Sequence, residues 1–235
     1  MKKLGIIGAM TVEVETLKAQ MENLTITKKA GMEFYEGRLE GLAVVVVVCG
    51  VGKVNAALCV QALCDLFGVT HIVNTGVAGS LDARLDIGDL VVSRDAMYHD
   101  FDCSSLNVNY PVGQVPGLAV RQFPADEMLS RLALEAAEAV CPGHARLGRV
   151  ASGDQFVSSQ EAKDKIIGNT QALCTEMEGA AIAHAAWKNG VPFAILRAIS
   201  DKADNSAEMD YPTFEAIAAR QCAAVTKLLA QKLAQ

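Results

Sequence analysis

The sequence has no surplus of basic residues and no long apolar run. Lysine and arginine together number 21 against 27 aspartates and glutamates, a formal net charge of -6. This balance disfavours nucleic acid or an anionic membrane as the main partner. No apolar run approaches the ~20 residues that a membrane-spanning helix needs. The apolar stretch near the N-terminus contains early glycine and ends at Glu13 and Glu15, unlike a signal peptide, so we expect a cytoplasmic protein.

The seven cysteines form no C-x-x-C pair, and the four histidines lack the spacing of metal ligands. Several cysteines stand inside apolar runs, which is typical of buried, reduced thiols. The sequence therefore predicts neither a disulfide framework nor a metal centre, and we expect no cofactor.

Glycine-rich segments are present, but none has the full spacing of a nucleotide-binding motif. The segment GVGKVN at Gly50 to Asn55 resembles part of a phosphate loop, yet the Ser or Thr after the lysine is missing. The third glycine of the dinucleotide fingerprint is also missing, because Asn55 stands in its place. Binding of a nucleoside triphosphate or a dinucleotide is therefore only weakly supported.

Apolar residues make up 51% of the chain and gather in short runs. These runs predict buried strands, and helical patterns follow several of them, which is typical of an α/β protein. The predicted strands are Leu4–Gly8, Ala43–Cys49, His71–Thr75, Gly88–Ser93 and Phe193–Ile199, and the predicted helices end near Phe67, Val140, Lys188 and Leu233. Because no linker, repeat or low-complexity tract appears, we expect residues 1–235 to form a single domain.

Three of the strands lead into glycine, at Gly8, at Gly50 and at the segment Gly76–Gly79. Three such turns at one sheet edge predict a cleft lined by backbone N–H groups. Each glycine taken alone can equally mark only a tight turn.

Acidic residues stand at the ends of predicted elements. Ser200 and Asp201 follow the strand Phe193–Ile199, at the edge where open α/β sheets bind ligands. Glu176 and Glu178 are two residues apart, so on a regular strand or helix we expect only one to face a given pocket. Glu13 falls in the first turn of a predicted helix. A structural explanation accounts for these positions equally well. Glu13, Glu176 and Glu178 could stand where they do because acids near a helix N-terminus interact favourably with the helix dipole, and Asp201 could belong to a solvated loop.

Thr11 is a candidate cap for the helix that carries Glu13. The segment Tyr98–Gly117 has no clear periodicity but contains Phe101, Leu106, Val108 and Tyr110. A long loop with this much apolar surface predicts packing against another subunit.

A series of short motifs in order resembles a known family from end to end. The motifs are IIGAMxxEV at Ile6–Val14, GVGKVNAA at Gly50–Ala57, NTGVAG at Asn74–Gly79, GDLVVS at Gly88–Ser93, YHDFD at Tyr98–Asp102, SGDQF at Ser152–Phe156, EMEGAAIAH at Glu176–His184 and RAISDKAD at Arg197–Asp204. Together they resemble bacterial 5′-methylthioadenosine/S-adenosylhomocysteine nucleosidase, of the nucleoside phosphorylase superfamily. The resemblance implies a three-layer α/β/α sandwich on a mixed central sheet, and a homodimer with residues 98–117 at the interface.

The resemblance also implies roles for individual residues in the release of adenine from an adenine nucleoside. Asp201 would protonate N7 of adenine as the general acid, and Ser200 would hold the loop that orients it. Glu13 would activate the attacking water, and Arg197 would order the carboxylates around it. Glu178 would accept hydrogen bonds from the ribose hydroxyls.

Other positions would shape the pocket. Phe156 would stack on adenine and the backbone of Val157 would read its edge. The remaining implied substrate-binding residues are Met177 against the sugar, Met10, Val51, Val77, Ala78 and Tyr211 along the pocket, and Cys103, Leu106 and Val108 supplied by the partner subunit.

The chemistry agrees with these assignments, because cleaving an N-glycosidic bond develops positive charge on the sugar and negative charge on the base. Two features depart from the family pattern: Val77 replaces a serine found in some members, and the loop at Leu106–Pro116 is longer and less aromatic. Aminodeoxyfutalosine or 5′-deoxyadenosine is therefore an alternative substrate. A purine nucleoside phosphorylase is disfavoured because the loop Gly8–Glu13 has no basic residue for phosphate. A non-catalytic nucleoside sensor is the other alternative.

Overall fold

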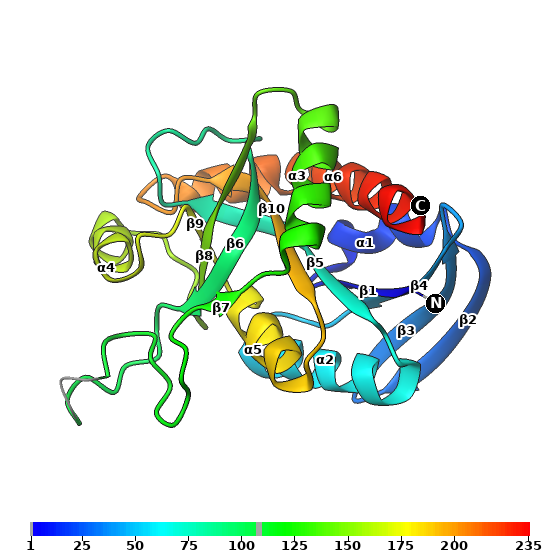
Figure 1. Ribbon diagram of the computed structural model, residues 1–235. Helices are drawn as coiled ribbons and strands as arrows, with labels where there is room; N and C mark the ends of the chain where they lie inside the picture. The colour runs from blue at the N-terminus through cyan, green and yellow to red at the C-terminus, as the bar shows by residue number, and fades with distance from the viewer. Residues whose placement is uncertain (1, 107–109) are drawn as a thin grey trace.

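The computed structural model describes residues 2–106 and 110–235, whose strands and helices alternate along the chain (Figure 1). The strands are β1 (Lys3–Gly8), β2 (Glu22–Lys29), β3 (Met32–Leu39), β4 (Leu42–Val48), β5 (His71–Ser80), β6 (Leu90–Tyr98), β7 (Phe123–Pro124), β8 (Ala145–Ser152), β9 (Cys174–Glu176) and β10 (Phe193–Asp201). The helices are α1 (Thr11–Lys18), α2 (Lys53–Phe67), α3 (Glu127–Val140), α4 (Gln160–Thr170), α5 (Gly179–Asn189) and α6 (Ala207–Ala234). No helix in these described parts of the chain is both long enough and apolar enough to cross a bilayer.

The strands form one mixed, ten-stranded sheet with the order β10-β6-β8-β9-β5-β1-β4-β3-β2, and β7 pairs with β6. β10 also pairs with β5, so β5, β10, β6, β8 and β9 close into a ring. The neighbours β1–β4, β1–β5, β5–β10, β6–β8 and β8–β9 run parallel. Parallel strands bring their carboxyl ends to a common edge, where α/β sheets place ligand sites.

Helices cover both faces of the sheet and make three layers, as Figure 1 shows. In β4, Val45 and Val47 join the core beneath α2 and α5, whereas Val44 and Val46 join the core beneath α1, α3 and α6. Alternate side chains of a strand point to opposite faces, so a strand buried on both sides is apolar throughout. The predicted three-layer α/β/α sandwich on a mixed sheet is confirmed.

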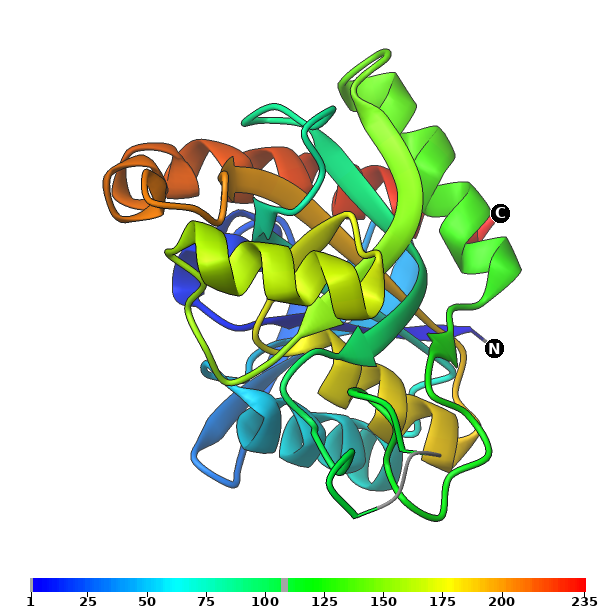
Figure 2. The ribbon, with the colours of Figure 1, turned by 90° about the vertical axis from the view of Figure 1, so that its left-hand side faces the viewer.

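A third, smaller core lies under α4, where Ile166 packs against Leu81, Ala151 and Val157. Figure 2 shows α4 from the side, in front of the ring of strands. This core anchors Val157 and with it the loop after β8.

Two details of the predicted elements are wrong. β5 does not turn at Gly76–Gly79 but continues through these glycines to Ser80. A Cβ atom at Gly76 would overlap the side chains of Arg197 and Glu13, and one at Gly79 would lie 2.7 Å from Oδ1 of Asp201. The glycines are thus needed for close approach of side chains, not for a turn.

Thr11 does not cap α1. Met10 occupies the cap position, and no side-chain hydrogen bond from Thr11 is part of the cap. Instead, Oε2 of Glu13 accepts hydrogen bonds from the backbone N–H groups of Ala9 and Met10, at 2.6 and 2.9 Å.

The strand β2 was not predicted, because all its residues are exposed and show no apolar alternation.

Candidate active site

A cavity of about 570 Å³ opens at the carboxyl ends of β1, β4, β8, β9 and β10 and beside the last residues of β5. This volume includes space that is open to solvent at the mouth of the cavity. The lining residues are Ala9, Met10, Glu13, Val51, Val77, Ala78, Gly79, Gln155, Phe156, Val157, Thr175, Glu176, Met177, Glu178, Ser200, Asp201 and Tyr211. The three acids predicted for the chemistry, Glu13, Glu178 and Asp201, therefore share one cavity.

Glu13 is buried, 1% exposed, and held by three backbone N–H groups. Besides the bonds to Ala9 and Met10, its Oε1 accepts the N–H of Val77 at 3.2 Å. Burial raises the pKa of the Glu13 carboxyl, although Arg197 and these N–H groups oppose the shift. The carboxylate is thus fixed in position but basic, a combination suited to accepting a proton from water.

Arg197 lies beneath the cavity and binds two glutamates. Its guanidinium is 1% exposed, contacts Glu176 and Asn74 directly, and lies 3.6 Å from Oε2 of Glu178. Burial alone would lower the pKa of Arg197, but Glu176, Glu178 and Glu13 outweigh it and keep the guanidinium charged. The guanidinium therefore organises the acidic wall from behind.

Both Glu176 and Glu178 line the cavity, so the expectation that only one would face it is wrong. Glu178 is the N-cap of α5 with φ -129° and ψ -37°, so neither strand nor helix spacing applies to the pair. Oε2 of Glu176 accepts the N–H groups of Glu178 and Gly179 at 3.1 and 2.8 Å. Burial and the charge of Glu176 raise the pKa of Glu178.

Asp201 stands at the end of β10, 3% exposed. The pairing of β10 with β5 shifts register between Ile199 and Asp201, and this irregularity allows the adjacent Ser200 and Asp201 both to line the cavity. Ser200 donates a hydrogen bond to Oδ2 of Asp201 at 2.9 Å, and the N–H of Ala203 donates to Oδ1 at 2.8 Å. Burial nevertheless raises the pKa of the Asp201 carboxyl, which favours its protonated form.

This raised pKa predicts a pH-dependent stability difference between the wild type and Asp201→Asn. A carboxyl with a raised folded-state pKa stabilises the fold most below its unfolded pKa and loses that contribution as pH rises through the folded pKa. Asparagine does not titrate, so the unfolding free energy of Asp201→Asn minus that of the wild type should grow from pH 3.8 upward, by at most ~1.4 kcal/mol per pH unit. Urea unfolding of both proteins across this range measures the difference. A difference that is flat or shrinks with pH would contradict the burial of a neutral Asp201.

Aromatic and sulfur-containing side chains close the outer part of the cavity. The rings of Phe156 and Tyr211 meet edge to face with centroids 5.5 Å apart. The hydroxyl of Tyr211 contacts Sδ of Met10 at 3.3 Å and donates to Glu215 at 3.0 Å. Phe156 is 45% exposed, so one face of a flat ring remains available for stacking.

Comparison with known proteins gives a consistent result. The model of the phosphorylase superfamily matches residues 3–231. A 5′-methylthioadenosine/S-adenosylhomocysteine nucleosidase of Halalkalibacterium halodurans is 42% identical over 216 residues, which are 91% of each chain. The chain belongs to the phosphorylase superfamily.

Solved structures of the superfamily agree with this assignment. A 5′-methylthioadenosine/S-adenosylhomocysteine nucleosidase of Neisseria meningitidis, in complex with methylthio-immucillin-A, is 34% identical with a TM-score of 0.94, covering 99% of this chain and 100% of that one. A futalosine hydrolase of Helicobacter pylori is also 34% identical, with a TM-score of 0.92 and 98% of each chain covered.

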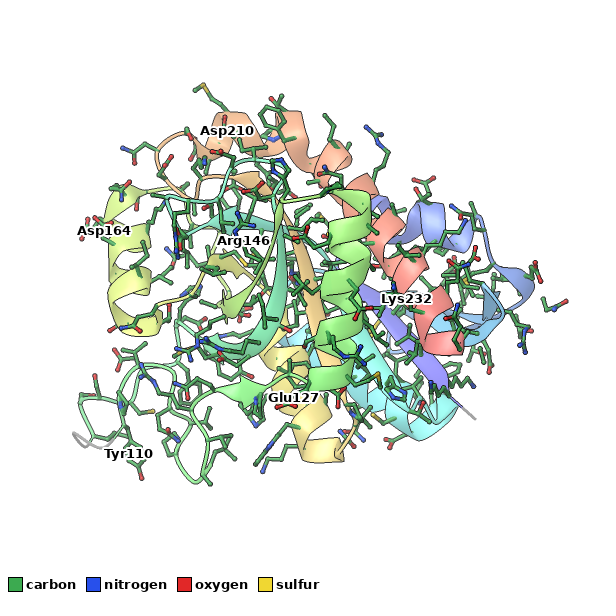
Figure 3. All side chains as sticks on the ribbon, turned by 45° about the horizontal axis from the view of Figure 1, so that its top comes forward. Tyr110, Glu127, Arg146, Asp164, Asp210 and Lys232 are labelled. Carbon is green, nitrogen blue, oxygen red and sulfur yellow. The ribbon has the colours of Figure 1, made fainter. Side chains whose placement is uncertain are left out.

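Most described residues assigned from the superfamily resemblance lie together in the cavity, but three of them do not line it. Arg197 lies behind the wall rather than on it. Cys103 and Leu106 lie in the loop after β6, which projects from the body of the molecule (Figures 1 and 2). Figure 3 shows Tyr110 at the outer part of this loop. Val108 lies outside the described residues.

Sequence reasoning missed several residues of the site. Ala9, Gly79, Gln155 and Glu176 line the cavity without having been assigned a role, as does Thr175, whose buried hydroxyl has no hydrogen-bond partner among the described residues. Ser152 and Asn74 form an outer layer: Ser152 bonds Glu176 and the N–H of Ala180, and Asn74 bonds Arg197. The available signal for Ser152 was its position at the end of β8, whereas Asn74 lies within β5. Within residues 2–106 and 110–235, no group of His, Cys, Asp and Glu is arranged to hold a metal ion.

Proposed function

We propose that this protein is a hydrolase that cleaves the N-glycosidic bond of 5′-methylthioadenosine and S-adenosylhomocysteine and releases adenine. The observation that carries the proposal is the convergence of Glu13, Glu178 and Asp201 on one cavity. The relatives named as nucleosidases of these two compounds support the choice of substrate.

The proposed mechanism divides the charge of the transition state between two ends of the cavity. Asp201, with a raised pKa and a hydrogen bond from Ser200, protonates N7 of adenine, so the base leaves neutral. Glu178 accepts hydrogen bonds from the ribose hydroxyls, and Glu13 takes a proton from the attacking water. The carboxylates near the ribose stabilise the cationic sugar as it forms. Arg197 positions Glu176 and Glu178.

The purine and the 5′ substituent are held by the remaining lining residues. Phe156 stacks on adenine and the backbone of Val157 contacts its edge, while Met177 packs on the sugar. Met10, Val51, Val77, Ala78 and Tyr211 complete the wall.

Water rather than phosphate is the proposed acceptor. The cavity wall, within the part of the chain that the structure describes, carries four carboxyl side chains and no lysine, arginine or histidine, which disfavours an anion. We therefore expect purified protein to release adenine from both nucleosides at rates that do not change when phosphate is added, measured by chromatography. Adenine release that requires phosphate would identify a phosphorylase, and ligand binding without release would identify a sensor.

The futalosine hydrolase among the similar structures supports a nucleoside related to futalosine as a second candidate substrate, and aminodeoxyfutalosine is the adenine nucleoside that we would test. The same assay on aminodeoxyfutalosine, 5′-deoxyadenosine and the two thio-nucleosides ranks them by kcat/KM. A higher kcat/KM for aminodeoxyfutalosine would reassign the 5′ specificity while leaving the mechanism unchanged.

We further propose that the protein is a cytoplasmic homodimer and that residues 1–235 of each subunit form one domain. Its proposed role is in methionine salvage. All seven cysteines are unpaired, which suits a reducing compartment. Exposed apolar side chains on α2, α5 and the loop after β6 support a subunit interface: Val54, Leu58, Leu66, Trp187 and Leu106. In the dimer, Cys103 and Leu106 would reach the neighbouring cavity.

Leu58→Glu should therefore shift the protein from dimer to monomer in sedimentation velocity, because a charge on this face would be buried without a partner. Ile217→Glu is the matched control: Ile217 on α6 is 49% exposed, as is Leu58, but it is not on α2, α5 or the loop. If the wild type sediments as a monomer, or if both variants dissociate equally, the proposed interface is wrong.

A further inference from the structure

Three segments far apart in the sequence meet at Lys53, the first residue of α2. Its Nζ lies 2.5 Å from Oδ2 of Asp100 and 3.5 Å from Oδ2 of Asp154. The backbone N–H of Asp154 donates to the same Asp100 oxygen at 2.9 Å. Asp100 follows β6 and Asp154 follows β8. We refer to these three residues as the Lys53 cluster.

The cluster also supplies the cap that α2 lacks. Gly52 occupies the N-cap position and has no side chain, so the N–H of Lys53 is bonded instead by Oδ1 of Asp154, at 2.8 Å. A carboxylate at a helix N-terminus is stabilised by the helix dipole. Gly52 has φ 98°, and a Cβ there would lie 3.1 Å from the same Asp154 oxygen, so glycine fits this junction best.

The backbone on both sides of the cluster lines the cavity. Val51 precedes Gly52, whose N–H donates to Oε1 of Glu178 at 2.8 Å. Phe156 and Val157 follow closely after Asp154. The cluster therefore joins the segment that contacts the ribose-side carboxylate to the segment that forms the purine-side wall.

We propose that Lys53 is a positioning residue that, through Asp100 and Asp154, sets the separation between Glu178 and the Phe156 wall and so determines nucleoside affinity. This inference rests on the proposed function. The side chains of Lys53, Asp100 and Asp154 are 23%, 24% and 50% exposed, so solvent screens the pair with Asp154 more than the pair with Asp100. Loss of these ion pairs should displace the loop after β8 and with it the stacking surface of Phe156, which weakens nucleoside binding.

The test is the kinetics of Lys53→Met with 5′-methylthioadenosine. We expect KM to rise about 10-fold while kcat stays within about 3-fold, because the reacting groups Glu13 and Asp201 are untouched. Lys53→Arg should recover most of the affinity, since it keeps the charge. Asp100→Asn, which changes no side-chain volume, should raise KM in the same direction. Lys227→Met is the control: it removes the ion pair with Glu40, 3.2 Å long, on α6, and should leave KM unchanged.

Ionic strength provides an independent readout. Added salt screens partly exposed charges, so the KM of the wild type should rise with salt and that of Lys53→Met should not. An unchanged KM in Lys53→Met, equal losses from Lys53→Arg and Lys53→Met, or a change of oligomeric state that accompanies the KM effect would each overturn the inference. Failure of the proposed function would look different, because the wild type itself would release no adenine.

Discussion

Replacing Asp201 with asparagine is expected to reduce adenine release by orders of magnitude, nearly to loss of turnover, while leaving the fold intact. General acid catalysis of this kind is worth ~10²–10⁴ in rate, so kcat should fall by that factor. The amide of asparagine has nearly the shape of the carboxyl. Its oxygen can still accept the hydrogen bond that the N–H of Ala203 donates to Oδ1 of Asp201 in the wild type, at 2.8 Å. It has no acidic proton to place on N7. Rapid-mixing assays of adenine release give kcat, and calorimetry with 5′-methylthioadenosine should show that binding persists.

Asp204→Asn is the control for this substitution. Asp204 stands three residues after Asp201, in the loop that follows β10; it bonds Ser206 and lies 3.8 Å from Lys163, and it does not line the cavity. Asp204 is the weakest of the causes that raise the pKa of Asp201, so its loss should leave kcat within about 3-fold. Near-wild-type kcat in Asp201→Asn would mean that the proton reaches the purine from another group.

The framework of the fold could be predicted because it depends on local patterns. The run of valines in β4 has no polar residue to place on a solvent face, so it had to be buried on both sides. The predicted helix ends near Phe67 and Lys188 agree with the ends of α2 and α5 within one residue. These signals also placed the strand ends, and with them Glu13 and Asp201, at one edge of the sheet.

Contacts between distant segments could not be predicted in this way. Glycine in a sequence signals a turn, but at Gly76 the reason for glycine is the space taken by Arg197 and Glu13, which come from other elements. Regular strand or helix geometry would place Glu176 and Glu178 on different faces, but the backbone at Glu178 adopts neither conformation. The strand β2 could not be predicted, because an exposed edge strand needs no alternation of apolar and polar residues.

Glu13→Gln is expected to spare nucleoside binding and lower kcat by at least ~10²-fold, because an amide cannot take a proton from water. Chromatographic kcat and calorimetric affinity measure the two effects separately. Glu15→Gln, an exposed position on the same helix, is the control and should change neither. If Glu13→Gln kept near-wild-type kcat, another group would have to activate the water.

The hydrogen bonds of Glu13 make this substitution more disruptive locally than its size suggests. The carboxylate accepts N–H groups on both oxygens, from Ala9 and Met10 on one side and Val77 on the other. Glutamine has one acceptor oxygen, so in either orientation of the amide its NH₂ group must face a backbone N–H. A modest loss of Tm should therefore accompany the kinetic effect.

The raised pKa of Glu13 predicts a pH dependence of kcat in the wild type. Since the ionised form is the base, kcat should fall as pH drops through that pKa and, on the alkaline side, as Asp201 loses its proton. The two acids therefore require opposite protonation states, and the pH range in which both hold bounds the activity.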